Sequence, residues 1–160
     1  MENKELLVFR TIGTEMAVKL GLEAVKAAGQ MGVSGFVLVY SRTGMQECSY
    51  AVGLEAKPLN VQIALAKIET VLSFRQSTGV RARYIEKKNI YPENYAGAVK
   101  TMFGGGLAIF ADPELKEFVG AIAFSGGEEW QDIQICCVAI HKAGLYTDEP
   151  RTDDEPTPHD

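Results

Sequence analysis

The stretch GLAIFADPELKEFVGAIAFSG, residues 106–126, decides the fold. It holds two apolar runs, GLAIFAD at 106–112 and FVGAIAFSG at 118–126, which are joined by PELKE. Pro113 and the charges of this joint are typical of a turn, so the pattern predicts two strands of one antiparallel sheet. Gly126 and Gly127 break the second strand, and EEWQDIQICCVAIHKAG at 128–144 predicts a helix that completes the domain.

The residues before this stretch predict helices and a hairpin. ELLVFR at 5–10 fits a short strand or an arm, and Thr14 is a candidate N-cap for a helix that runs to about Gly29 or Gly32. GFVLVYS at 35–41 and QECSYAV at 46–52 flank the turn residues RTGM and predict a β-hairpin. Residues 78–97 are polar and predict a loop with a short helix.

A second long helix is predicted where Pro58 precedes LNVQIALAKIETVLSF. Its apolar residues fall at helical spacing on two sides, with Val61, Leu65, Ile68 and Leu72 on one and Ile63, Ala66, Thr70 and Phe74 on the other. A helix that is apolar on two sides is buried on two sides. It lies either inside the domain or between its own sheet and another subunit.

The order of elements predicts an α+β domain with a mainly antiparallel sheet packed with long helices. A chain of 160 residues suits one domain, which we place at residues 1–146. Residues 147–160, TDEPRTDDEPTPHD, hold six acids and one base and alone carry the formal charge of −5. We predict an acidic disordered tail here, whose deletion leaves folding intact.

Charge and hydropathy exclude several classes of protein. Residues 1–146 are electrically balanced, which argues against a nucleic-acid partner because phosphate binding needs a basic surface. No apolar run approaches the roughly 20 residues of a membrane span, and no export signal is visible, so we expect a cytoplasmic protein without a membrane partner. Cys48, Cys136 and Cys137 cannot all pair and are expected to be reduced thiols.

Two glycine-rich stretches are candidate binding elements. Gly104, Gly105 and Gly106 enter a strand and fit either a ligand-binding lip or a flexible approach to a hairpin. Ser125, Gly126 and Gly127 lie between a strand and a helix, where free backbone N–H groups favour an anion site or a helix cap without a ligand.

Basic side chains supply a second set of candidates. Lys67 lies close in angle to the side of its helix that carries Ile63 and Phe74, so it reaches either a carboxylate-bearing ligand or solvent. Arg75, Arg81, Arg83, Lys87 and Lys88 form a basic stretch with tyrosines interleaved or just beyond. This stretch could hold an acidic ligand or the acidic tail, or be a solvated loop.

A metal site is not predicted. Cys137 and His141 are four residues apart, which places two ligands on one helical face. The chain has only two histidines, however, and His159 belongs to the predicted tail. A buried thiol beside a partly buried imidazole is the simpler interpretation.

Three groups of residues resemble one known family. They are Val61-Gln62-Ile63-Ala64-Leu65-Ala66-Lys67 with Thr70 and Phe74, then Gly105-Gly106-Leu107 with Ile109, and Val119-Gly120-Ala121-Ile122 with Ser125-Gly126-Gly127 and Asp132. In order and spacing the chain is similar to the GlcG/HbpS family, which is also found as the C-terminal domain of PduO proteins. The resemblance implies a profilin-like domain, homo-oligomers and, as in several members, binding of haem or a related tetrapyrrole.

The chain departs from the family at some positions. Leu59-Asn60 stand where Ala-Ser is frequent, Ala108 stands in place of Pro, and Ser41-Arg42-Thr43-Gly44 replace Asp-Ala-Gly-Gly. A histidine that ligates haem in some relatives has no counterpart in the first helix, which leaves His141 as a ligand to be tested.

These observations lead to three functional hypotheses. The first is a cytoplasmic, oligomeric small-molecule-binding protein with haem or a tetrapyrrole as candidate ligand. Its predicted site comprises Asn60, Lys67, Phe74, Gly104, Gly105, Gly106, Ser125, Gly126 and Gly127. The alternative is a small catabolic enzyme, an isomerase, tautomerase or hydrolase, that uses Lys67 or Glu69 for proton transfer in the same pocket. The third is an assembly partner or stabiliser of another enzyme, with the acidic tail as a solubilising segment.

Overall fold

The computed structural model describes residues 7–8, 10–88 and 103–149. Its sheet has four antiparallel strands in the order β4-β3-β6-β5. These strands are β3 (Gly35–Ser41), β4 (Gln46–Val52), β5 (Gly106–Phe110) and β6 (Phe118–Ser125). The α+β class and the two strands predicted within residues 106–126 are therefore confirmed.

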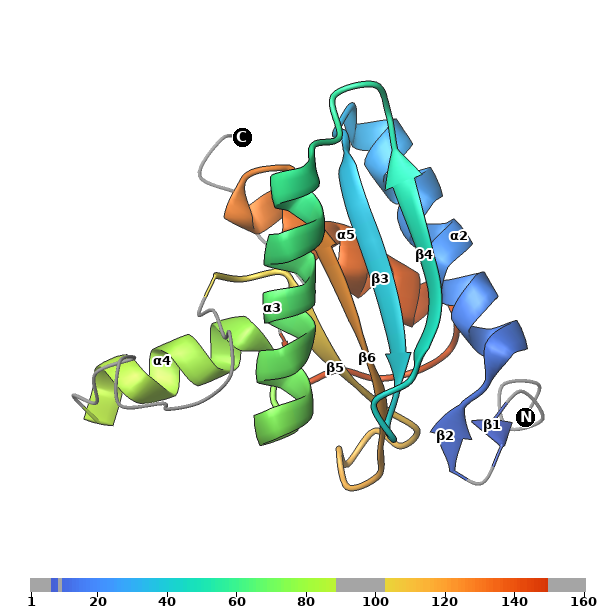
Figure 1. Cartoon of the computed structure of the whole chain (residues 1–160). Helices are drawn as coiled ribbons and strands as arrows, with labels where there is room; N and C mark the ends of the chain where they lie inside the picture. The colour runs from blue at the N-terminus through green and yellow to red at the C-terminus, as the bar shows by residue number, and fades with distance from the viewer. Residues whose placement is uncertain (1–6, 9, 89–102, 150–160) are drawn as a thin grey trace.

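Helices cover both faces of this sheet (Figure 1). On one face lie α2 (Thr14–Met31) and α5 (Glu129–Lys142), and on the other lies α3 (Pro58–Phe74). Because β6 is covered on both faces, all of its residues are buried. Val119, Ile122 and Phe124 face α2 and α5, whereas Phe118, Ala121 and Ala123 face α3.

The two apolar sides of α3 have different surroundings. Ala64, Ile68 and Val71 pack on the sheet. On one side Ala66 and Thr70 are buried, and Phe74 lies under the guanidinium of Arg81 from α4 (Thr78–Lys88), 4.0 Å from the ring centroid. On the other side Val61 and Leu65 are exposed. The first side is thus covered by the chain itself, whereas the second is exposed at Val61 and Leu65 and buried against the sheet at Ile68.

Several boundaries differ from the prediction. The first long helix starts at Thr14 as expected, but Gly13 is its N-cap, and Gly32 ends it with φ +68°. Within 5–10, Leu7–Val8 form β1, which pairs with β2 (Thr11–Ile12). Residues 78–88 form the regular helix α4 where a loop with a short helix was predicted, and the rest of that segment, to residue 97, includes positions outside the described residues.

Residues 146–149 run along β5, the edge strand of the sheet. The backbone of Tyr146 exchanges two hydrogen bonds with Phe110, at 2.8 and 3.0 Å. Asp148 accepts hydrogen bonds from the backbone N–H and the hydroxyl of Ser77, and Glu149 is buried. The predicted boundary at residue 146 is therefore too early, because residues 147–149 make packed contacts. The remainder of the predicted tail, 150–160, lies outside the described residues.

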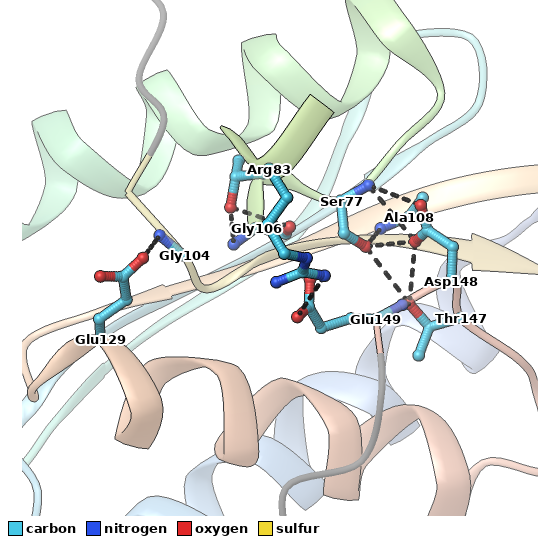
Figure 2. Close-up of polar contacts among 10 residues, drawn as sticks. Ser77, Arg83, Gly104, Gly106, Ala108, Glu129, Thr147, Asp148 and Glu149 are labelled. Atoms are coloured by element: carbon cyan, nitrogen blue, oxygen red, sulfur yellow. Dashed lines mark hydrogen bonds and ion pairs between the residues drawn. The ribbon is translucent and has the colours of Figure 1, made fainter. Parts of the chain in front are cut away.

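The outward N–H groups of β5 are all bonded by neighbouring segments, and Figure 2 shows those of Gly106 and Ala108. Gly106 N donates to Thr78 Oγ1 at 3.1 Å, and Ala108 N donates to Ser77 Oγ at 3.0 Å. Phe110 N donates to the carbonyl of Tyr146. The start of α4 and the end of the described chain thus complete this edge of the sheet. None of the described helices combines the length and apolar character that a bilayer crossing requires.

Candidate functional site

Lys67 of α3 and Asp132 of α5 form a buried ion pair at the end of β6 where that strand turns into α5. Lys67 Nζ lies 2.9 Å from Asp132 Oδ2, and their side chains are 2% and 6% exposed. The ammonium group also donates a hydrogen bond of 2.7 Å to the carbonyl of Phe124. Since α3 and α5 lie on opposite faces of the sheet, this pair joins the two helical layers.

The glycines at 105 and 106 make room for this pair. Gly105 has φ +108°, and a Cβ atom there would lie 2.6 Å from Asp132 Cβ and 2.8 Å from Lys67 Nζ. A Cβ atom on Gly106 would lie 2.8 Å from Lys67 Cβ. Contacts this short are not tolerated in a packed interior. The close approach to Lys67 therefore accounts for two of the three glycines that the sequence suggested as a ligand lip.

Asp132 is satisfied at both carboxylate oxygens. Its Oδ1 accepts a hydrogen bond of 2.9 Å from Gly127 N, and its Oδ2 faces Lys67. Burial raises the pKa of the Asp132 carboxyl above its ordinary value, while the charge and hydrogen bond of Lys67 act in the opposite direction. The charge of Lys67 is consequently balanced inside the protein, and the predicted contact with a ligand carboxylate would compete with Asp132.

The turn at Ser125-Gly126-Gly127 is occupied by the chain's own acceptors. Gly127 N bonds Asp132, and Glu128 N donates to Gln131 Oε1 at 2.8 Å. Glu128 caps the start of α5, since its side chain accepts from the backbone N–H of Gln131. Of the two interpretations of this turn, a helix cap fits the geometry and a free anion site does not.

A cavity of ≈ 190 Å³ opens beside the ion pair. Its lining comprises Ile63, Lys67, Phe103, Gly104, Ser125, Gly127, Glu129 and Asp132. The backbone N–H of Gly104 donates to Glu129 Oε1 at 2.8 Å, which fixes one wall (Figure 2). Two acidic side chains and one basic side chain line the cavity, so its charges do not favour an anion.

A second cavity of ≈ 340 Å³ lies on the other side of the 126–127 turn. Its lining comprises Gly32, Val33, Ser34, Glu55, Lys57, Asn60, Gly126, Gly127 and Gln131. The predicted site is therefore divided between the two cavities. Lys67, Gly104 and Ser125 line the first, Asn60 and Gly126 line the second, and Gly127 lines both.

Phe74 and Glu69 do not join the other predicted residues. Phe74 lies against Arg81, and neither Phe74 nor Glu69 lines either cavity. The pKa of Tyr40 on β3 is raised by burial and, second, by the charge of Glu69, which therefore acts toward the sheet. Of the two residues proposed for proton transfer, Lys67 therefore lines the cavity, where it is paired with Asp132, and Glu69 does not line it.

The prediction missed Phe103, Glu129 and Asp132 as lining residues. Phe103 directly precedes the three glycines, and Glu129 and Asp132 lie in the first turn of α5. Their nearness in the sequence to the two glycine-rich turns was the signal that could have identified them as lining residues. Nothing local in the sequence shows that Asp132, 65 positions after Lys67, is the carboxylate that meets it.

Neither the thiols nor the described histidine lines these cavities, although Cys136 Sγ donates a hydrogen bond of 3.5 Å to the carbonyl of Gly105, beside the ion pair. The pKa of Cys48 is raised to about 11, mainly by burial, and burial also raises the pKa of Cys136 well above its ordinary value. His141 is exposed in the last turn of α5 and lines neither cavity. Among the described residues, no group of three potential metal ligands occurs.

The basic stretch partly holds the chain's own acids. Arg83 Nη2 lies 3.2 Å from Glu149 Oε1, as Figure 2 shows. Arg81 stacks on the rings of Phe74 and Tyr84, and Arg75 lies 5.7 Å from the ring centroid of Phe118. Of the interpretations left open for this stretch, contact with residues of the acidic segment is the one observed, through Glu149.

Comparison with known proteins gives one family. The model of the HbpS-like family, described as haem degrading protein HbpS-like, matches residues 12–141. No curated protein matches this chain.

Solved structures share the fold. A structure of a PduOC–haem complex has a TM-score of 0.75 and 21% identity, covering 87% of this chain and 99% of its own. HbpS gives a TM-score of 0.71 at 23% identity, with coverages of 87% and 94%. Protein ORFY of Klebsiella pneumoniae gives 0.73 at 22% identity, with coverages of 83% and 90%.

Proposed function

The chain belongs to the HbpS-like family, and we propose that it is an oligomeric small-molecule-binding protein. Its ligand is haem or a related tetrapyrrole, bound on the surface beside the Lys67–Asp132 cavity, where a second copy of the chain covers it. The family and the haem bound by the similar PduOC protein support the ligand class. A cytoplasmic location stays a prediction.

The exposed apolar side chains at the mouth of the cavity carry this proposal. Phe103 is 62% exposed and Leu59 is 58% exposed. Leu59 lies one helical turn before Ile63, which lines the cavity together with Phe103. Large apolar side chains that gather at the surface favour a binding site, and a flat macrocycle presents a matching apolar face.

A basic side chain is available near this surface. Lys57 precedes α3, lines the neighbouring cavity and is exposed. It can meet a ligand carboxylate without leaving a buried acid unpaired. Lys67 cannot do so, because Asp132 already occupies it.

The residues present do not fit a haem enclosed within one chain. The cavity of ≈ 190 Å³ is smaller than the ~300–1,000 Å³ typical of small-molecule pockets. His141, the histidine among the described residues, lines neither cavity. An open surface completed by a partner removes the limit of size, and the exposed residues Val61 and Leu65 of α3 supply further apolar surface for such a contact.

Haemin titration tests the proposal. We expect a Soret shift that saturates near one haem per chain or per pair of chains. Phe103→Ala and Leu59→Ala should each weaken binding about tenfold, a loss of ~1.4 kcal/mol. Met45→Ala removes an equally exposed apolar side chain at the far end of the sheet and should change nothing. No shift in the wild type, or one unaltered by both site variants, would overturn the proposal.

The same samples separate binding from degradation. A Soret band that stays constant over hours, relative to haemin alone, indicates binding without turnover. A band that decays faster with the protein than without it indicates an activity of the kind that names the family. Sedimentation of the loaded protein shows whether haem and subunit assembly are coupled.

A further inference from the structure

We propose that the outer face of α2 is a two-fold contact with a second copy of this chain, in which two α2 helices pack antiparallel. Figure 1 shows α2 at the side of the molecule, with β4 and α5 on its inner side. This face is formed by Glu15, Val18, Lys19, Leu22, Glu23, Val25 and Lys26, all of α2.

One edge of this face is an apolar row. Val18, Leu22 and Val25 follow at spacings of four and three residues, which places them on one side of the helix. Leu22 is 49% exposed, and the two valines are half-buried at its flanks. Such a row at the surface is available for packing against another apolar row.

The other edge is a charged row of alternating sign. Glu15, Lys19, Glu23 and Lys26 succeed one another along the same face. In a helix that runs in the opposite direction, the order of these residues is reversed, so each positive charge comes to lie opposite a negative one. An antiparallel copy would therefore set Glu15 against Lys26 and Lys19 against Glu23, whereas a parallel two-fold copy would place the charged row against the apolar row.

Two-fold symmetry satisfies both rows at once. A two-fold axis perpendicular to the helices and passing near residue 21 reverses their direction while keeping each edge opposite the same edge of the copy. Val18 then meets Val25 of the second copy, and Leu22 packs beside its own counterpart. Glu15 and Lys26 are eleven residues apart, about 16 Å along the helix, so they cannot pair within one chain.

One interaction within the helix must be shared. Lys26 Nζ lies 3.3 Å from Glu23 Oε1 of the same helix, and the lysine side chain is well exposed. An exposed pair of this kind contributes little, and the ammonium group has three donors, so it can hold Glu23 and also meet Glu15 of the copy. The contact uses one helix per copy, less than the ~800 Å² a side of standard interfaces, so we expect reversible association.

This contact is separate from the proposed haem site. The α2 helix lies on the opposite face of the sheet from α3, so the two surfaces can be occupied together. Failure of either proposal leaves the other standing, because haemin titration reports on Phe103 and Leu59 and does not involve α2.

Sedimentation across a range of protein concentrations tests the contact by charge exchange. Glu15→Lys and Lys26→Glu should each weaken one association step about tenfold. The double variant Glu15→Lys with Lys26→Glu should restore it, because each new lysine faces a new glutamate on the copy. Lys116→Glu, an exposed reversal on the β5–β6 turn, is the matched control and should leave association unchanged.

Substitutions of Leu22 test the contribution of the apolar row. Leu22→Glu should abolish the step, with an unchanged thermal transition as evidence of folding. Leu22→Cys should form a disulfide-linked dimer under mild oxidation, since the two positions lie near the axis. Absence of the step in the wild type, or a double variant as weak as the single ones, overturns the proposal.

Discussion

Asp132 and Glu149 are both buried carboxylates beside a basic side chain, but they are held in opposite ways. Both oxygens of Asp132 are bonded, and its partner Lys67 is as buried as itself. One carboxylate oxygen of Glu149 forms an ion pair with Arg83, whose side chain is 57% exposed. Its other oxygen, Oε2, is buried with no hydrogen-bond partner among the described groups.

This difference makes the Lys67–Asp132 pair a rigid junction between helices and the Arg83–Glu149 pair a weaker attachment of the chain's described end. Burial raises the pKa of both carboxyl groups, because the charged form loses hydration. At Asp132 the buried ammonium group of Lys67 and the backbone N–H of Gly127 act against this rise, and at Glu149 the solvated Arg83 and the backbone N–H of Val80 do so. The pair next to the cavity should therefore resist perturbation, whereas the end of the described chain should detach at lower cost.

The largest effect is expected from Asp132→Ala. It leaves the Lys67 ammonium group buried without its counter-charge, and we expect unfolding to become easier by about 3–5 kcal/mol. Urea denaturation followed by tryptophan fluorescence and circular dichroism measures the change. The double variant Lys67→Met with Asp132→Ala removes both charges and should recover part of the loss. A loss below about 1 kcal/mol in the single variant would mean that the pair is not a structural junction.

A middle-sized effect should follow from shortening the chain. Ending it after residue 146 removes the acceptor of Ser77 and the partner of Arg83, and should cost about 1–3 kcal/mol, the range for hydrogen bonds to charged groups. Ending it after residue 149 keeps both contacts and should leave the thermal transition where it was. Equal stability of the two shortened chains would support the sequence-based expectation that the whole segment 147–160 is dispensable.

The smallest effect is expected from Glu149→Gln, and it depends on pH. The raised pKa means that the folded state binds this proton more tightly than the unfolded state does. The resulting stability is fully present below the ordinary pKa of 4.5 and is lost as pH rises through the raised value. As the pH rises from about 4.5 through the raised pKa of Glu149, the wild type should therefore lose stability relative to the variant. The loss should be no more than about 1 kcal/mol because Arg83 is solvated.

Thermal melts at several pH values measure this difference. Glu114→Gln, an exposed substitution, serves as the control. If the wild type instead becomes more stable relative to the variant as the pH rises, the charge of Arg83 outweighs the burial of Glu149.

Local patterns were sufficient for much of the fold. The apolar runs around Pro113 predicted β5 and β6, and Pro58 marks the start of α3, where its missing N–H costs no hydrogen bond. The polar composition of 78–97 predicted a loop with a short helix but not the extent of α4, whose stability comes in part from Asp148 at its start and from Arg81 against Phe74. Such tertiary contacts override weak local preference.

The candidate site was predictable only in part. Helical spacing placed Lys67 toward the side of α3 that also carries Ile63, and both residues line the cavity. The identity of its partner depends on how α3 and α5 cross the end of the sheet, which spacing cannot reveal. In the same way, composition made Asp148 and Glu149 look solvated, although Ser77 and Arg83, about seventy positions earlier, hold them.

The completed edge of β5 also bears on how copies of this chain can meet. An open edge strand offers N–H and C=O groups on which another strand can add, and this is a route to aggregation. At β5 the donors of Gly106, Ala108 and Phe110 are all taken. Growth of the sheet from molecule to molecule is blocked on that side, which leaves helix faces and the β4 edge for association.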